Sequence, residues 1–433
     1  MTPAARIAAA IEVIASIDAM RVPAAQSLKE WGVAHRFAGS GDRAAISGLV
    51  YDTLRRRASS SWLLGENSAR AQVLGMLKLE RGLDVSAIAK LCSGERHAAD
   101  QLSERERTAL TSASLDGAPS HVAGDYPEWL DPAFNRVFGD ERVAEAIAMS
   151  HRAPLDLRVN TLNSERDKIL ASLRHLRAKP TPWSPVGLRI LLDADARSPG
   201  IQAEPDFIKG AIEVQDEGSQ LAALLSDARE GETVVDLCAG AGGKTLALAA
   251  AMAGRGRLIA TDADKRQLAP IHERLRRAGA HNVEVRTPKG SEDPLGDLAG
   301  RCDLVVIDAP CTGTGTWRRN PDAKWRIRPG ALEIRIRDQI EVLDRAVPLL
   351  KRGGRIAYIT CSVLQEENSD QISAFIARHN DFASVPPISV ASKLGPSAKG
   401  FCDSVRLFDE GLLMTPRRTS TDGFFVAVLK RPH

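Results

Sequence analysis

The sequence is short of the residues that build cross-linked or membrane-embedded folds. Its 433 residues include only six cysteines, scattered and without a CxxC pair, which argues against a disulfide framework and a zinc ribbon. No apolar run approaches the roughly 18 residues of a membrane span, and charges interrupt the start of the chain. We therefore expect a cytoplasmic protein without signal peptide or membrane contact, whose functional cysteines are free thiols.

An excess of one charge is also missing. Lys and Arg total 58 against 55 Asp and Glu, a net charge of +3 that is too small for a histone-like polycation. Nucleic-acid binding would have to come from local patches. Hydrophobic residues make up 43% of the chain, enough to fill real cores. At 433 residues the chain is long enough for two or three domains.

Apolar spacing divides the chain into three predicted domains. Residues 1–120 show helical spacing with few β-branched runs, which predicts an all-α N-terminal domain. A linker composition follows, and residues 125–212 then combine short apolar runs with a helical stretch, as in a small α/β domain. Residues 213–433 form the third predicted domain.

The third domain alternates short apolar strands with helices, which predicts a Rossmann-like, doubly wound parallel sheet. The expected strands are 233–237, 257–261, 283–286, 303–307 and 355–360. Two later runs, 405–408 and 423–430, have strand character without an intervening helix pattern. They predict an antiparallel hairpin at one edge of the sheet.

A glycine-rich turn follows the first of these strands. Residues 238–245 read CAGAGGKT and lead into an alanine- and leucine-rich helix, the layout of a nucleotide-type site. A phosphate loop needs glycine where Cys238 stands, and a dinucleotide loop needs a different glycine spacing. S-Adenosylmethionine is the ligand class that remains. Asp262, which follows the second strand, would accept hydrogen bonds from its ribose hydroxyls. The alternative is a packing turn, with Asp262 and Asp264 as helix caps.

Two cysteines are predicted to lie where adjacent strands end. Cys311 follows the fourth strand and Cys361 the fifth, at the sheet edge where open α/β folds bind ligands. Methylation at carbon 5 of a pyrimidine uses such a thiol, because a thiolate adding at carbon 6 makes carbon 5 nucleophilic. Asp308 is placed to stabilise ring charge near N3. Cys311 is a candidate to assist removal of the carbon-5 proton. A lone cysteine is more often a small buried hydrophobe, and we interpret Cys92, Cys302 and Cys402 in this way.

Four motifs resemble the Nop/Sun family of RNA cytosine-5 methyltransferases, especially the bacterial 16S rRNA methyltransferase B group: CAGAGGKT, DAPCTGTGTWRRNPDAKW, TCSVLQEEN and the terminal DGFF. The resemblance is strong over 210–433 and implies a class I methyltransferase that uses S-adenosylmethionine. It makes Cys361 the nucleophile and Cys311 the group that helps release the product. It places cofactor contacts on Asp262, on Asp308 and on the loop residues Cys238, Ala239, Gly240, Ala241, Gly242, Gly243 and Lys244.

The chain departs from the family pattern at two places. Gly240-Ala241 replaces the Ala-Pro of the family loop, a change that we expect cofactor binding to survive. Lys289 stands about where the family often has an acidic residue near the adenine. Two other functions stay open: the same chemistry on tRNA, and a catalytically inactive RNA-binding factor in ribosome assembly.

RNA contacts are expected after Cys311. Residues 310–355 hold eleven basic and five acidic residues, and Trp317 and Trp325 interleave the arginines, which predicts phosphate contacts with base stacking. The 125–212 domain resembles the family's small RNA-binding domain. The helical N-terminal domain resembles the antitermination-factor-like module of the bacterial group. Candidate contacts are Arg318, Arg319, Gly41-Asp42-Arg43 and Arg55-Arg56-Arg57. We expect a monomer that requires no metal.

Overall fold

The chain forms two compact units in a computed structural model that describes residues 1–192, 199–288 and 293–432. Among these residues, unit 1 consists of Met1–Arg152 and Trp317–Ile327, and unit 2 contains the rest. The chain thus leaves unit 2 after Thr316 and returns to it at Arg328. The three domains expected from the sequence stay a prediction, because these units reflect compactness alone.

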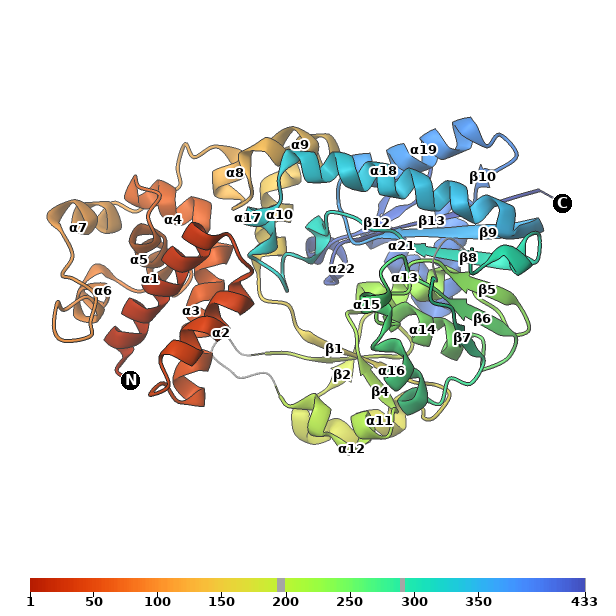
Figure 1. Cartoon of the computed structure of the whole chain (residues 1–433). Helices are drawn as coiled ribbons and strands as arrows, with labels where there is room; N and C mark the ends of the chain where they lie inside the picture. The colour runs from red at the N-terminus through yellow and green to blue at the C-terminus, as the bar shows by residue number, and fades with distance from the viewer. Residues whose placement is uncertain (193–198, 289–292, 433) are drawn as a thin grey trace. The chain divides into compact units, whose positions relative to one another are not determined.

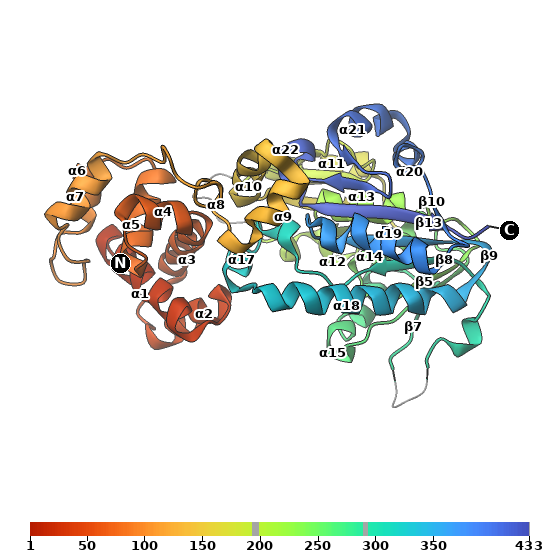
Figure 2. The same ribbon diagram turned by 90° about the horizontal axis from the view of Figure 1, so that it is seen from above.

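Unit 1 is helical in its described part. Its α-helices are α1 (Pro3–Met20), α2 (Ala24–Ala34), α3 (Ser40–Arg55), α4 (Arg57–Leu64), α5 (Ala69–Leu79), α6 (Val85–Leu91), α7 (Glu104–Thr111), α8 (Ser120–Ala123), α9 (Asp131–Phe138), α10 (Arg142–Ser150) and α17 (Ala323–Arg326). Figure 2 shows α1, α3, α4 and α5 grouped together. The apolar faces of α1, α3 and α5 supply the fully buried Ile14, Ile46 and Leu74.

The segment Trp317–Ile327 packs inside unit 1 although its neighbours in sequence belong to unit 2. Trp317 is 1% exposed and stacks on Phe134, with ring centroids 5.7 Å apart. Lys324 Nζ donates hydrogen bonds to the backbone oxygen of Arg55 and to Oγ of Ser150, both at 3.1 Å. These contacts satisfy polar groups that burial would otherwise leave unpaired.

Unit 2 begins with a small antiparallel sheet in the order β2-β3-β1-β4. Its strands are β1 (Leu155–Val159), β2 (Lys179–Pro180), β3 (Gly187–Ile190) and β4 (Ile212–Val214), with α11 (Arg166–Ser172) and α12 (Pro205–Ile208) between them in sequence. The buried Leu157, Val159 and Leu188 of the sheet and Ile169 of α11 share one apolar core. The helical stretch expected at 164–176 is α11 followed by a 3-10 turn.

A larger sheet holds the carboxyl edge where the site was expected. Its order is β11-β12-β13-β9-β8-β5-β6-β7, with β10 paired to β13. The parallel strands are β5 (Thr233–Asp236), β6 (Arg257–Ala260), β7 (Val283–Val285), β8 (Cys302–Asp308) and β9 (Leu350–Thr360). In register, Asp308 of β8 lies beside Ile359 of β9, so the segments carrying Cys311 and Cys361 leave the sheet side by side.

Helices cover both faces of this sheet (Figure 1). Their bounds are α13 (Glu217–Leu225), α14 (Gly243–Ala251), α15 (Lys265–Leu268), α16 (Ile271–Ala278), α18 (Pro329–Ala346), α19 (Ser369–Arg378), α20 (Pro387–Ala391), α21 (Ala398–Ser404) and α22 (Pro416–Thr419). In the view of Figure 1, α18 and α19 lie above the strands, with α14 and α16 below. The predicted Rossmann-like, doubly wound sheet is therefore confirmed. In the described ranges no helix is long and apolar enough to cross a membrane.

The antiparallel edge differs from the predicted hairpin. The two predicted strands correspond to β11 (Arg406–Leu407) and β13 (Phe424–Lys430), but they do not pair with each other. The unpredicted β12 (Leu412–Met414) lies between them, and β13 pairs antiparallel with β9, while β10 (Ala383–Ser384) joins its far end. The antiparallel edge was predicted correctly, but the pairing of its strands was not, because the three apolar residues of β12 show no strand periodicity.

Candidate active site

The glycine loop connects β5 to α14 and leaves space beside its backbone. Gly240 and Gly242 have φ angles of +50° and +85°, in the left-handed region that favours glycine. A Cβ on Gly242 would lie 2.4 Å from Cγ1 of Ile271, so this position admits no side chain. A Cβ on Gly240 would meet nothing within 4 Å. A ligand can therefore approach the loop backbone closely at Gly240.

Asp262 follows β6 and contacts this loop. Its Oδ2 accepts a hydrogen bond from the backbone nitrogen of Gly240 at 2.9 Å, and its Oδ1 accepts one from that of Asp264 at 2.9 Å. Asp264 instead caps α15, where it accepts from the backbone nitrogen of Arg266 at 2.9 Å. The two acids therefore have different tasks: Asp264 begins a helix, whereas Asp262 joins the second strand to the glycine loop.

Polar groups are buried beneath the loop. Thr245 Oγ1 donates to Oδ2 of Asp236 at 2.7 Å, but in the described structure Oδ1 of Asp236 and Oγ1 of Thr261 have no hydrogen-bond partner. Burial raises the pKa of Asp236 to about 7. Burial and the nearby charges of Asp236, Asp308 and Asp262 raise the pKa of the Cys238 thiol well above its usual range. The thiol of Cys238 is therefore protonated, and Cys238 lines the site without being a candidate nucleophile.

Lys244 points from α14 to the end of β8. Its Nζ donates to Oδ2 of Asp308 at 2.7 Å and lies 5.0 Å from the ring centroid of Phe424. Burial disfavours the ammonium charge, but the charge and hydrogen bond of Asp308 outweigh burial and raise the pKa of Lys244. The sequence assigned Lys244 to the cofactor loop. The structure places its charged end against Asp308, and the role of both residues stays a prediction.

The two thiols are in contact. The Sγ atoms of Cys311 and Cys361 are 3.4 Å apart, and both residues are half-buried. The hydrogen bond to Cys361, burial, and the charges of Cys361 and Glu367 raise the pKa of Cys311 well above its usual range. Either sulfur can donate in this contact. A thiol that donates to a neighbouring sulfur stabilises negative charge on it.

Sequence reasoning missed Glu367, a buried acid beside the thiols. It ends the 3-10 turn Gln365–Glu367 and accepts hydrogen bonds from the backbone nitrogen of Thr312 at 2.7 Å and from Oγ1 of Thr312 at 2.5 Å. Gln339 of α18 donates to it at 3.1 Å. Its position inside the TCSVLQEEN motif, six residues after Cys361, was the available signal.

Comparison with known proteins gives this geometry a family. The chain matches the family described as 16S rRNA methyltransferase RsmB/F over residues 223–430, and the RsmF/B-like ferredoxin-like domain over residues 126–196. It is 31% identical to the ribosomal RNA small subunit methyltransferase B of Photorhabdus laumondii, covering 76% of this chain and 71% of that relative. The chain belongs to the RsmB/F family. The resemblance to Nop/Sun methyltransferases seen in the sequence is thereby confirmed.

Solved structures agree with RsmB/F membership at the level of the fold. A methyltransferase homolog from Pyrococcus horikoshii aligns with a TM-score of 0.57 and 26% identity, covering 72% of this chain and 97% of that one. NSun6 from the same organism aligns with a TM-score of 0.59 and 20% identity, covering 71% and 98%. The chain thus shares its fold with these proteins.

Several RNA contacts expected for this RsmB/F-family chain are wrong. Trp317 cannot stack on a base because its ring is buried against Phe134. Arg318 is 5% exposed and Lys324 is fully buried, so neither presents its charge to a phosphate. Nε1 of Trp325 donates a hydrogen bond to the backbone oxygen of Leu54 at 2.6 Å. Packing inside unit 1 therefore accounts for most of this basic segment.

The N-terminal arginine run has structural partners too. Arg55 donates to the backbone oxygen of Arg318 at 2.9 Å. Arg56 pairs with Glu80 at 2.7 Å, and Arg57 with Asp18 at 2.8 Å. In the other candidate cluster, Asp42 binds the N-terminal ammonium and Arg6, and Arg43 donates to the backbone oxygen of Ala38. The ion pairs of Arg56, Arg57 and Asp42 make these three residues poor candidates for RNA contacts, whereas Arg43 is exposed and stays a candidate.

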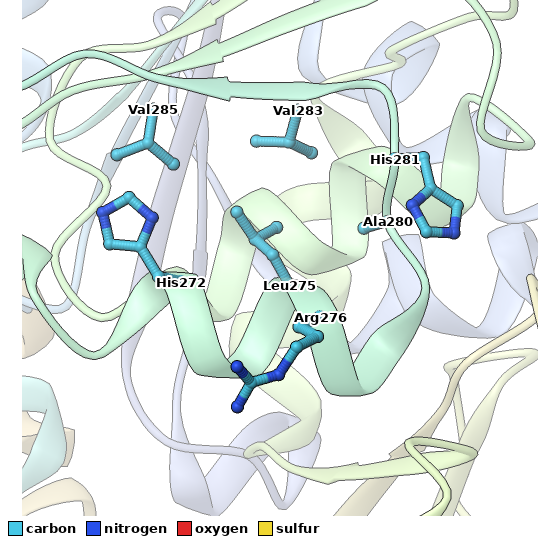
Figure 3. A pocket seen from close by; sticks show the side chains of 7 residues that line it. All are labelled: His272, Leu275, Arg276, Ala280, His281, Val283 and Val285. Carbon is cyan, nitrogen blue, oxygen red and sulfur yellow. The ribbon is translucent and has the colours of Figure 1, made fainter.

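A hollow beside the edge strand β7 lies apart from the candidate residues (Figure 3). It is lined by His272, Leu275, Arg276, Ala280, His281, Val283 and Val285, with the two valines directed from β7 toward α16. None of the glycine-loop residues or thiols lines it, so this hollow is not part of the candidate site.

Lys289, the departure from the family's acidic residue, lies outside the described residues. Within the described ranges, no cluster of three His, Cys, Asp or Glu side chains is arranged for a metal.

Proposed function

We propose that this chain methylates carbon 5 of a cytosine in 16S rRNA. RsmB/F membership supports methyl transfer to small-subunit rRNA. One observation carries the finer assignment: two thiols 3.4 Å apart at the ends of neighbouring strands, next to a paired lysine and aspartate. Carbon-5 methylation of a pyrimidine uses these groups, since it requires a nucleophile, charge stabilisation of the ring, and a group that removes a proton.

The glycine loop and Asp262 fit S-adenosylmethionine, which supplies an activated methyl group when bound. The open space at Gly240 admits a ligand against the backbone, and Oδ1 of Asp236 and Oγ1 of Thr261 offer polar atoms without partners in the described chain. Asp262 would accept hydrogen bonds from the ribose hydroxyls. Backbone N–H groups where α14 begins would bind the amino-acid carboxylate. Lys244 and Asp308 would then face the cytosine ring of the substrate.

Cys361 opens the reaction by adding to carbon 6 of the cytosine. A free thiol has a pKa of about 8.5, so the nucleophile needs help to lose its proton near neutrality. In our proposal the neighbouring Cys311 thiol donates to the Cys361 sulfur during the attack, and Lys244, whose pKa Cys361 helps to raise, supplies a positive charge nearby. The resulting bond joins the enzyme to the RNA.

The Lys244–Asp308 pair stabilises the ring during this addition. Negative charge spreads toward N3 and O2 as carbon 6 becomes tetrahedral. In our proposal Asp308 faces N3 and passes to it the proton held on Lys244 Nζ, 2.7 Å from its carboxylate, so that the developing charge is neutralised. Carbon 5 thereby gains the electron density that it needs to accept a methyl group.

Product release requires the carbon-5 proton to leave, after which the Cys361–carbon-6 bond breaks and the thiolate departs. Cys311 is the proposed base. Because its pKa is raised, Cys311 can take this proton only after it has given its own proton to solvent, and its thiolate fraction grows as the pH rises. We therefore expect the covalent species to decay faster with increasing pH from neutral into the alkaline range.

Mapping 5-methylcytosine in total RNA from cells with and without the gene tests the proposal. The expected result is one cytosine of 16S rRNA that loses its methyl group in the deletion and regains it with the wild-type chain but not with Cys361→Ala. Loss confined to a tRNA would support the tRNA alternative. Unchanged methylation of every RNA, together with a ribosome-assembly defect rescued by Cys361→Ala, would establish the non-catalytic assembly factor.

A further inference from the structure

The segment around Cys311 is held by side chains from distant parts of the chain. Thr312, the next residue, gives both its backbone N–H and its hydroxyl to the carboxylate of Glu367. On the other side, Gln339 Nε2 donates to the backbone oxygen of Pro310 at 3.0 Å and also to Glu367. The backbone is therefore anchored immediately before and immediately after the thiol.

Asn368, the neighbour of Glu367, anchors the other thiol segment. Its Nδ2 donates to the backbone oxygen of Ser362 at 2.9 Å, and its Oδ1 accepts from Oγ1 of Thr360 at 2.5 Å. These two partners lie on either side of Cys361. Consecutive residues of one turn thus each hold one thiol segment, and their fixed spacing sets how the two sulfur atoms face each other.

Glu367 itself is rigidly placed and fully buried. The hydroxyl of Tyr358 in β9 donates to its backbone oxygen at 2.7 Å. Its side-chain donors, Thr312 and Gln339, are neutral groups, and burial raises the pKa of the carboxyl. Burying such a carboxyl group costs free energy. Its presence is therefore explained by the geometry that it imposes on its partners and not by a gain in stability.

We infer that Glu367 is a positioning residue that places Cys311 for the release step. This inference rests on the proposed carbon-5 methylation. Glu367 does not touch the base; it holds Thr312 and, through Gln339, Pro310. Without it, Cys361 can still form the bond to carbon 6, but Cys311 is no longer placed to remove the carbon-5 proton. The covalent enzyme–RNA species should then accumulate, as we also expect when Cys311 itself is absent.

The test compares Glu367→Ala with Glu367→Gln in the full chain. A glutamine can accept from the Thr312 and Gln339 nitrogens through its oxygen and donate to the Thr312 hydroxyl through its nitrogen, so it should preserve the anchor. Each variant is incubated with S-adenosylmethionine and unmethylated 16S rRNA transcript, and the covalent species is followed on denaturing gels. Glu341→Ala, on the exposed side of α18, is the matched control for loss of one carboxylate.

The expected result is adduct decay slowed roughly 10- to 100-fold in Glu367→Ala, the scale for a catalytic group misplaced by about 1 Å, with cofactor affinity unchanged. Glu367→Gln and Glu341→Ala should decay like the wild type. Wild-type decay in Glu367→Ala would overturn the inference. So would a shared loss of cofactor binding and thermal stability in both Glu367 variants, which would mark a purely structural residue.

A second measurement does not depend on RNA. Diamide oxidises two adjacent thiols to a disulfide and takes up their two hydrogens, so the rate of Cys311–Cys361 cross-linking reports the distance between the sulfur atoms. It should fall in Glu367→Ala and not in Glu367→Gln. If the wild type methylates no RNA, the proposed function fails. A slowed cross-link would then still support the positioning role, and an unchanged one would overturn it.

Discussion

Lys244 in unit 2 and Lys324 in unit 1 are both buried, yet their surroundings act on the ammonium in opposite directions. Burial disfavours the charge of Lys244, but contact with Asp308 outweighs burial and raises its pKa. For Lys324 burial dominates and lowers the pKa to about 7, although Asp125 opposes it. The hydrogen-bond acceptors of Lys324 are a backbone oxygen and a hydroxyl, which carry no charge.

The difference distinguishes the region around Lys244, which maintains a buried charge, from the region around Lys324, where hydrogen bonds hold separate segments of the chain together. A carboxylate in direct contact maintains the Lys244 charge beside two thiols, where the proposed chemistry uses it. Neutral acceptors satisfy the hydrogen bonds of Lys324 without stabilising its charge, and they tie Trp317–Ile327 into a helical core. Variants of the two regions should therefore change different properties: catalysis in the first, and stability in the second.

Removing the thiols should have the largest effect. Cys361→Ala should abolish methylation and form no covalent RNA species, whereas Cys311→Ala should form the species and release it slowly, visible on denaturing gels. The double variant should match Cys361→Ala, because the first bond requires that thiol. Cys92→Ala, in the core of unit 1, is the control and should methylate normally. An adduct in Cys361→Ala that is absent from Cys311→Ala would reverse the two roles.

Replacing each lysine by methionine tests the comparison directly. Lys244→Met should lower the methylation rate roughly 10²- to 10³-fold, as expected when a preorganised charge is removed from a site. Lys324→Met should methylate at close to the wild-type rate, since its charge serves no step. Single-turnover methylation of 16S rRNA at saturating cofactor measures both. Equal losses in the two variants would show that unit 1 also controls the chemical step.

Asp262 and Asp264 form a second matched pair, within unit 2. Asp262→Ala should weaken S-adenosylmethionine binding by roughly 1.5–3 kcal/mol for each hydrogen bond to the charged acceptor that the substitution removes. Asp264→Ala removes the cap of a single-turn helix and should leave binding nearly unchanged. Titration calorimetry with the full chain distinguishes them. Unchanged affinity in Asp262→Ala would refute the assignment of the ribose hydroxyls to this acid.

The pKa of Lys324 predicts a pH dependence of unit 1. Its folded value of about 7 lies below the ordinary 10.5, so between these values the unfolded chain binds the extra proton. Stability therefore rises with pH across that window, and the penalty for charging Lys324 is fully present below pH 7. The melting temperature of the wild type relative to Lys324→Met should increase from pH 7 to 10. A constant difference would contradict the lowered pKa.

The smallest effect concerns the salt dependence of RNA binding. Arg328 and Arg337 are exposed, unlike the buried Arg318 and Lys324. Changing each to Glu should reduce the slope of log affinity against log salt by roughly 0.7–0.9 for every phosphate that the arginine neutralises. Lys324→Met should leave the slope unchanged. Filter binding over a salt series measures this, and equal slopes in all variants would place the RNA on another surface.

Much of the site followed from local patterns. Strands separated by helices predict a parallel sheet, and the carboxyl ends of its strands meet at one edge, which placed Asp262, Asp308, Cys311 and Cys361 near one another on sequence grounds alone. The contact partner of Lys244 did not follow, because Asp308 is 64 residues away in sequence. Glu367 was missed for the same reason: its role depends on Thr312, 55 residues before it.

The sequence by itself determined the alternation of strands and helices, the left-handed glycine turn and the motifs of the RsmB/F family, because these depend on residues a few positions apart. Tertiary structure decided which charges are available. Trp317 and Lys324 match an RNA-binding composition, yet burial within unit 1 removes them from that role. Composition records which side chains are present, whereas their solvation and charge depend on the groups that folding brings into contact with them.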